Sequence, residues 1–269
     1  MVVPNHMLEQ GANEFRRLYP SANILLADKR AMSPKHRAQF VAKCAMGDYD
    51  AIIFTHKQFE KIPVSKQTRK EFLEKRREDL LALRDSISGT HRLTIKRIER
   101  QILTLENRLR KLEEKKDLGV TFEQTGIDAL LVDEFHYFKN FGFPTSIDDA
   151  AREPSARAED MMMKFDYLRA RGGRLVGATA TPLANSIAEA WVMTRFFRPD
   201  LLQANGTQNF DTWAATYGKV ITVSEMEVDG RLRERHRFQE FNNVDELLTT
   251  WSVFTDSIHP DELKMDTPQ

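Results

Sequence analysis

Residues 130–140 read LLVDEFHYFKN, a short apolar run that ends abruptly in charge. The run from Ala129 to Val132 predicts a buried parallel strand. Asp133 and Glu134 follow it directly, and His136 comes two residues later. Such carboxylates are costly at the end of a buried strand unless they are paired, hydrogen-bonded or bound to a metal. Two interpretations stay open: a pair that holds Mg²⁺ and orients an attacking water, or an acidic turn between strand and loop.

The composition sets the broad class. The chain has 269 residues, and 40 basic side chains balance 40 acidic ones, so any nucleic-acid site must be a local patch. The single cysteine, Cys44, excludes an internal disulfide and a Cys-rich zinc site. No apolar run reaches the length of a membrane span and no signal peptide is visible, so we expect a cytoplasmic protein.

Strands and helices alternate over residues 1–65. Apolar runs at 2–3, 24–27 and 50–55 predict strands, and helices are expected at 7–19 and 33–46. This order favours a parallel sheet with crossover helices, so the fold class is α/β. The chain opens directly on the strand-like pair Val2-Val3, from which we expect a truncated gene, an alternative start or a fragment of a larger protein.

Residues 66–118 have a different composition, rich in charge and free of proline. Apolar residues recur at a 3-4-3-4-3 spacing, which is typical of a coiled-coil seam: Ile95, Ile98, Ile102, Leu105, Leu109 and Leu112. A matching stripe precedes it, with a turn expected at 86–91. We therefore expect an antiparallel coiled-coil hairpin inserted between two strands. Its basic residues outnumber its acidic ones, which fits either a nucleic-acid arm or an ordinary solvated helical face.

The sheet resumes over residues 119–200. Strands are expected at 126–132 and 174–178, and helices at 156–170 and 184–197. The second strand runs into Thr179-Ala180-Thr181-Pro182. Residues 201–259 predict an α+β extension with a short helix at 210–217, a β-hairpin around Asp229-Gly230 and a last helix at 244–254. Residues 260–269 are expected to form a linker.

The two strand ends belong together. In a doubly wound sheet, ligands bind at the carboxyl ends of the strands, so the segments after residues 132 and 178 should share one rim.

At this point the sequence resembles a known family. Residues 132–140 are similar to the D-E-x-H-x-x-K-N box of superfamily-two DExH-box helicases of the Swi/Snf type. Residues 175–186, with Glu189 and Trp191, resemble the following box of that family, L-x-G-T-P-x-x-N-x-x-x-E-x-W. The early VP box is matched by Val3, Pro4, Leu8, Gln10 and Glu14, and residues 50–55 resemble the strand before the DNA-contacting loop.

The overall likeness is to the helicase segment of large phage- and plasmid-borne helicase–methylase proteins. Those proteins carry a helical insertion before the DExH box, as well as segments like residues 210–215 and 241–247 after the later box. The resemblance implies a RecA-like P-loop NTPase fold. It also implies ATP and Mg²⁺ as cofactors and DNA as the partner, with RNA not excluded.

The resemblance also implies roles for individual residues. Asp133 would bind Mg²⁺ through water, and Glu134 would act as the general base in Mg-ATP hydrolysis. The nucleotide site would be coupled to the nucleic-acid face by His136, Thr179, Thr181, Lys139 and Asn140. The nucleic-acid backbone would be approached by Pro4, Asn5, His6, Thr55, His56 and Lys57.

Several of these residues also fit purely structural roles. Thr179 and Thr181 also fit as caps of the next helix, a plausible rival role for Thr181 with Pro182 at the first helical position. His136 fits as a satisfied loop histidine, and His6 and His56 as incidental residues.

The phosphate loop that the resemblance implies is missing from this sequence. No G-x-x-x-x-G-K-[ST] motif occurs, and in the resembled family this phosphate loop lies on the strand just before the VP box. We therefore expect a fragment that lacks both this loop and the second RecA-like domain, and that is inactive alone. No N-P-P-[YF] methylase box is present.

The predicted function is the partial first motor domain of an ATP-dependent DNA helicase or translocase. The alternative is a non-catalytic module that binds nucleic acid or a partner through its basic coiled coil. A metal-dependent hydrolase using Asp133, Glu134 and His136 is a weaker third possibility.

Overall fold

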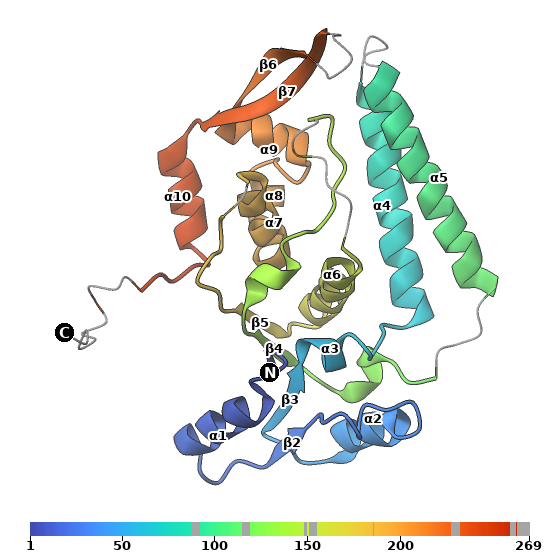
Figure 1. Ribbon diagram of the computed structural model, residues 1–269, viewed down its shortest axis with the longest axis vertical. Helices are drawn as coiled ribbons and strands as arrows, with labels where there is room; N and C mark the ends of the chain where they lie inside the picture. The colour runs from blue at the N-terminus through green and yellow to red at the C-terminus, as the bar shows by residue number, and fades with distance from the viewer. Residues whose placement is uncertain are drawn as a thin grey trace.

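The protein, described by a computed structural model, contains a five-stranded parallel sheet with strand order β2-β3-β1-β4-β5 (Figure 1). The strands are β1 (Val2–Val3), β2 (Ile24–Leu26), β3 (Ala51–Thr55), β4 (Ala129–Val132) and β5 (Arg174–Gly177). The structure describes residues 1–87, 92–114, 119–147, 150, 155–184, 186–226, 232–258 and 262. The expected hairpin turn at 88–91, Asn185, the Asp229-Gly230 turn and most of the 260–269 linker lie outside these residues.

The register aligns the carboxyl ends of the central strands. Val2 pairs with both Phe54 and Val132, and Val132 pairs with Gly177. The segments after β1, β3, β4 and β5 therefore leave the sheet at one edge. The α/β class and the parallel sheet are confirmed.

Two faces of the sheet pack differently. On one face, Val2, Phe54, Leu130 and Val132 join the main core with helices α2 (Arg37–Met46) and α6 (Ala156–Ala170). On the other, α1 (Leu8–Leu18) covers Val3 and Ile53. The burial expected for β4 is therefore only half right: Leu130 is 1% exposed, whereas Leu131 and its β5 partner Val176 are each 49% exposed.

Residues 66–114 form two long helices, α4 (Lys66–Ser86) and α5 (Arg92–Glu114), which run side by side along one flank of the molecule (Figure 1). A separate hydrophobic cluster joins them, made of Leu73, Leu80, Leu83, Ile98, Ile102, Leu105 and Leu112. The clustered residues follow the apolar stripe that predicted the helical pair.

Glu159 of α6 attaches this pair to the body of the protein. Its side chain is 4% exposed and accepts hydrogen bonds from Arg76 of α4 at 2.5 Å and from Arg108 of α5 at 2.7 Å. Arg97 donates to the Thr145 carbonyl at 2.8 Å. Several basic side chains of the helical pair therefore point inward.

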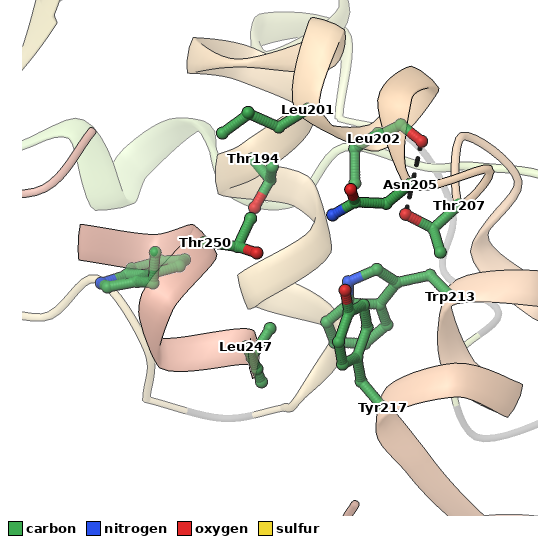
Figure 2. A pocket seen from close by; sticks show the side chains of 10 residues that line it. Thr194, Leu201, Leu202, Asn205, Thr207, Trp213, Tyr217, Leu247 and Thr250 are labelled. Carbon is green, nitrogen blue, oxygen red and sulfur yellow. Dashed lines mark hydrogen bonds between the residues drawn. The ribbon is translucent and has the colours of Figure 1, made fainter. Parts of the chain in front are cut away.

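The C-terminal part adds α7 (Ala188–Phe197), α8 (Pro199–Ala204), α9 (Phe210–Tyr217), the antiparallel strands β6 (Gly218–Met226) and β7 (Leu232–Phe241), and α10 (Val244–Ser252). The two antiparallel strands of the expected β-hairpin and the last helix are present. Figure 2 shows a pocket lined by Trp213, Tyr217 and Leu247 among others, but its volume of about 10 Å³ leaves room for no more than one water.

Two helices begin later than expected. Residues 33–36 form turns, in which the Ser33 carbonyl accepts from the amides of His36 and Arg37, so α2 starts at Arg37. Similarly, α7 starts at Ala188 with Ile187 as its N-cap residue. Thr179 and Thr181 therefore do not cap that helix, and the capping role considered for them is wrong.

Candidate functional site

The acidic pair lies at the carboxyl edge of the sheet, between two neighbouring strands. The Asp133 amide donates to the Val2 carbonyl at 2.8 Å, and the Phe135 amide donates to the Ala178 carbonyl at 2.8 Å. These backbone bonds extend the sheet pairing beyond Val132. They place the residue 133–136 loop beside the residue 178–181 loop, as the shared rim requires.

Glu134 has an unusual backbone conformation. Its φ is 51°, in the left-handed region, which costs a non-glycine residue on the order of 1–3 kcal/mol. Its amide donates to Asp133 Oδ1 at 2.9 Å. Both carboxyl side chains are partly exposed. The turn thus presents two adjacent acids at the strand end without burying either.

His136 joins this acidic turn to the next loop. Its Nδ1 lies 3.0 Å from Glu134 Oε2 and 3.4 Å from Thr179 Oγ1. Because a carboxylate only accepts hydrogen bonds, the contact with Glu134 requires the hydrogen on Nδ1. Thr179 Oγ1 in turn accepts from the Thr181 amide at 3.1 Å. His136 thus contacts both motifs, and these contacts also satisfy its ring as expected of a loop histidine with partners.

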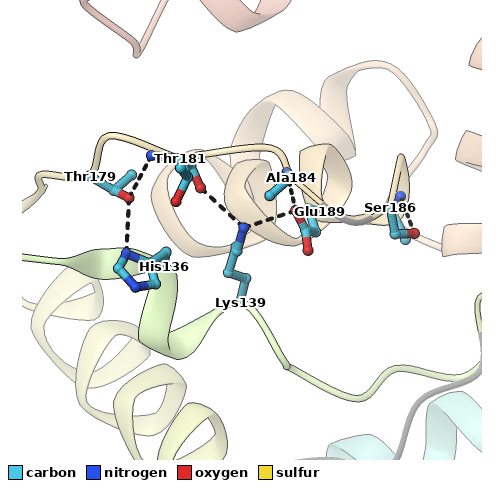
Figure 3. A network of polar contacts seen from close by, with 8 residues as sticks. His136, Lys139, Thr179, Thr181, Ala184, Ser186 and Glu189 are labelled. Carbon is cyan, nitrogen blue, oxygen red and sulfur yellow. Dashed lines mark hydrogen bonds and ion pairs between the residues drawn. The ribbon is translucent and has the colours of Figure 1, made fainter.

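Lys139 makes a second connection between the same loops (Figure 3). Its ammonium donates to the Thr181 carbonyl at 3.1 Å and to Glu189 Oε2 at 3.0 Å. Glu189 Oε2 also accepts from the Ala184 amide at 2.7 Å. The buried Lys139–Glu189 pair therefore holds the loop after β5 between η2 (Phe135–Phe138) and α7.

Asn140 lines an adjoining open pocket. This pocket has a volume of about 430 Å³, and its lining also includes His136, Lys139, Arg157 and Thr181. Asn140 itself is exposed. The later residues of the D-E-x-H-x-x-K-N stretch, from His136 to Asn140, thus contribute to a surface depression next to the paired loops.

The residues expected to approach nucleic acid divide into exposed and buried groups. Asn5, His6 and Lys57 are exposed, whereas Pro4, Thr55 and His56 are buried. Asn5 Oδ1 accepts from the Lys57 amide at 3.4 Å, so the loops after β1 and β3 touch. The Thr55 side chain is used in a capping box with Gln58 at the start of α3 (His56–Phe59).

His56 lies in the interior, in a place that the sequence did not indicate. It is 4% exposed, and its Nε2 lies 2.9 Å from the Asp133 carbonyl oxygen. Burial lowers the pKa of His56, against the opposing effect of the Asp133 hydrogen bond. The imidazole side chain does not reach the surface where nucleic acid was expected.

Oxygen ligands of this kind suit a hard cation. Asp133 and Glu134 offer carboxylate oxygens next to solvent, which is the donor set that Mg²⁺ takes when it keeps several waters. Among the residues that the structure describes, no three His, Cys, Asp or Glu side chains gather in a ligand cluster. Asp133 and Glu134 are therefore the residues that could hold Mg²⁺ through water at this edge.

Within the described ranges, no helix is long and apolar enough to cross a membrane.

The chain combines a parallel sheet with an acidic turn that contacts the Thr179–Thr181 loop at one edge. Residues 4–258 match the family described as a probable helicase domain, and the chain belongs to that family. The chain is also similar to the defense against restriction protein B of Escherichia phage P1, with 26% identity over 208 residues. That match covers 74% of this chain but 9% of the phage protein. No solved structure matches the chain.

Sequence reasoning missed two contacts of the site. The burial of the Lys139–Glu189 pair and the His56–Asp133 bond both depend on side chains far apart in the sequence. Glu189 entered only through the family resemblance. No local signal marked His56 as a partner of the acidic turn.

Proposed function

We propose that this chain is the first motor domain of an ATP-dependent nucleic-acid helicase or translocase of superfamily two, Swi/Snf type. The observation that carries the proposal is the junction of the two loops. His136 contacts Thr179, and Lys139 contacts the Thr181 carbonyl, at the carboxyl edge of a parallel sheet. Membership of a helicase family supports the same assignment.

Asp133 and Glu134 would have different roles in ATP hydrolysis. Asp133 would hold Mg²⁺ through water, and Glu134 would accept a proton from the attacking water. His136, bonded to Glu134 Oε2, keeps that carboxylate oriented. When bound, Mg²⁺ neutralises charge on the ATP phosphates.

The two side-chain connections would link this pair to the nucleic-acid face. A shift of the loop after β5 must change the His136–Thr179 contact or the Lys139–Thr181 bond, because both end on that loop. Asn140 lines the adjoining pocket and belongs to the same stretch. The exposed Asn5, His6 and Lys57, on touching loops at the same edge, would contact the phosphate backbone of DNA, with RNA as the other candidate.

The ATP phosphates need a loop that this sequence does not contain. In the described part of the chain β5 pairs with β4 alone, and Leu131 and Val176 leave apolar surface open on the adjoining face. A further parallel strand with its following helix would pair with β5 and cover that surface. We therefore place the phosphate-loop segment there, and a second RecA-like domain across the same edge. Residues 1–269 alone should not turn over ATP.

In the alternative function, the chain is a non-catalytic module that binds nucleic acid or a partner through α4 and α5. Fluorescence anisotropy with labelled DNA and RNA oligonucleotides separates the two. The motor proposal predicts that Lys57→Ala weakens binding several-fold and lowers the salt slope by about one, while deletion of residues 66–117 has little effect. Loss of affinity on that deletion, with Lys57→Ala and Asp133→Ala harmless, would favour the helical module. Lys75→Ala, on the exposed side of α4, is the matched single-charge control.

A further inference from the structure

We infer that His56 is a positioning residue for the Asp133–Glu134 pair, acting through the peptide group that joins the two acids. Its Nε2 lies 2.9 Å from the Asp133 carbonyl oxygen, which belongs to that peptide group. The inference rests on the proposed function, in which this pair is the hydrolysis centre. It gives His56 a role inside the protein instead of at the nucleic-acid surface.

The peptide group is held at both ends. Its carbonyl faces His56, and its N–H donates to Asp133 Oδ1 at 2.9 Å. The orientation of this plane sets the φ of Glu134, which is 51°. Uncommon backbone angles persist only where the surroundings fix them. Rotation of this peptide would break the N–H bond that orients the Asp133 carboxylate and would change the φ of Glu134, and the His56 bond opposes that rotation.

His56 is itself held firmly enough to serve this purpose. It begins α3, whose start is fixed by the capping box of Thr55 and Gln58. Its ring packs edge-on against Tyr137 and Phe138, with centroid distances of 5.4 Å in both cases. A carbonyl oxygen only accepts, so the hydrogen of the bond belongs to Nε2.

The bond also connects two parts of the proposed motor. His56 adjoins Lys57, the exposed residue whose amide bonds to Asn5. A displacement of this segment by a bound strand would therefore reach the acidic turn through one side chain. Neither His136 nor Lys139 provides that connection, because both reach the loop after β5.

Two variants of the full chain separate the hydrogen bond from the shape of the ring. His56→Phe keeps an aromatic ring but removes the donor, whereas His56→Gln places an amide donor near the position of Nε2. His36→Phe is the control, because His36 is exposed at the start of α2 and makes no side-chain capping bond. Circular dichroism establishes that each variant is folded.

The first readout is hydrogen exchange of the Glu134 amide, followed by ¹H–¹⁵N NMR. We expect exchange about tenfold faster in His56→Phe, the loss of roughly one hydrogen bond, and near wild-type exchange in His56→Gln and His36→Phe. A general structural defect would instead affect amides throughout α3 and would not be rescued by glutamine. Unchanged Glu134 exchange in His56→Phe would overturn the inference.

The second readout is Mn²⁺ binding, followed by water-proton relaxation, with Asp133→Asn as the reference. We expect Asp133→Asn to abolish site binding and His56→Phe to weaken it about tenfold, as for other residues that orient metal ligands. If Asp133→Asn changes nothing, the metal assignment of the proposed function fails, while the exchange result still decides the role of His56. If Asp133→Asn abolishes binding and His56→Phe does not weaken it, the inference fails and the proposed function stands.

Discussion

Lys139 Nζ lies 3.0 Å from Glu189 Oε2, and both side chains are almost completely buried, with exposed fractions of 7% and 2%. The two residues are far apart in the sequence, and their contact fixes the loop after β5 against α7. Each member of a buried ion pair depends on the other, because removal of one leaves an uncompensated charge in the interior and destabilises the fold.

The first prediction concerns this pair. Lys139→Met should lower the free energy of unfolding by about 3–5 kcal/mol, because it leaves the Glu189 charge buried. Lys139→Met/Glu189→Gln should recover part of that loss, since glutamine still accepts from the Ala184 amide without carrying charge. Urea denaturation measures both, and a double variant as unstable as the single one would contradict this role of the buried charge.

A second prediction concerns the attachment of α4 and α5. Glu159→Ala leaves Arg76 and Arg108 without their shared carboxylate and should cost about 3 kcal/mol. Asp79→Ala breaks an exposed pair with Lys75 at 3.8 Å and should cost less than about 1 kcal/mol. Chemical denaturation compares the two, and equal costs would show that Glu159 does not anchor the helical pair.

The uncovered face of β4 gives a third prediction. Leu131→Ala should change the free energy of unfolding by about 0.5 kcal/mol or less, because Leu131 is 49% exposed. Leu130→Ala, one residue earlier and 1% exposed, should cost about 2–5 kcal/mol. Similar losses at the two positions, measured by thermal unfolding, would mean that the face is covered.

The buried thiol of Cys44 predicts how stability and thiol reactivity depend on pH. Burial raises the pKa of its thiol from 9.0 to about 12. The folded chain therefore keeps this proton more tightly than the unfolded chain, and the associated stability is complete below pH 9 and is lost as the pH rises toward 12. We expect iodoacetamide to leave Cys44 unmodified at pH 8.5 in buffer and to alkylate it in urea, as followed by mass spectrometry. Equally fast modification in buffer would contradict its burial.

Local sequence patterns predicted where the strands and helices lie, but not which of their faces are buried. The apolar runs before Asp133 and Thr179 located β4 and β5, and the 3-4 spacing from Ile95 to Leu112 located α5. The exposure of Leu131 could not be predicted, because it depends on which helix covers one face of the sheet. The start of α7 was placed too early, because Pro182 was taken as the start signal although the Ser186 hydroxyl, a capping group closer to the helix, accepts from the Ala188 amide at 3.2 Å.

In the candidate site, too, the positions of the motifs were predicted from the sequence, whereas the contacts between distant side chains were not. Motif order placed the acidic turn and the Thr179–Thr181 loop on one rim, and the register of β4 with β5 brings them together. The burial of His56 was not predicted, since nothing near residue 56 reports that its ring packs against Tyr137 and Phe138. Such contacts depend on tertiary packing between segments that are about eighty residues apart, as is usual for sites built on strand ends.

The central claim is that Glu134 is the general base of a nucleic-acid-dependent ATPase. Its most direct test is DNA-stimulated ATP hydrolysis by a polypeptide that joins residues 1–269 to a phosphate-loop segment and a second motor domain. We predict that Glu134→Gln lowers kcat by about 10²–10⁴-fold, the usual contribution of a general base, with nucleotide affinity retained. Glu9→Gln, on the exposed side of α1, should leave kcat unchanged. DNA-stimulated hydrolysis that persists at the wild-type rate in Glu134→Gln would contradict the claim.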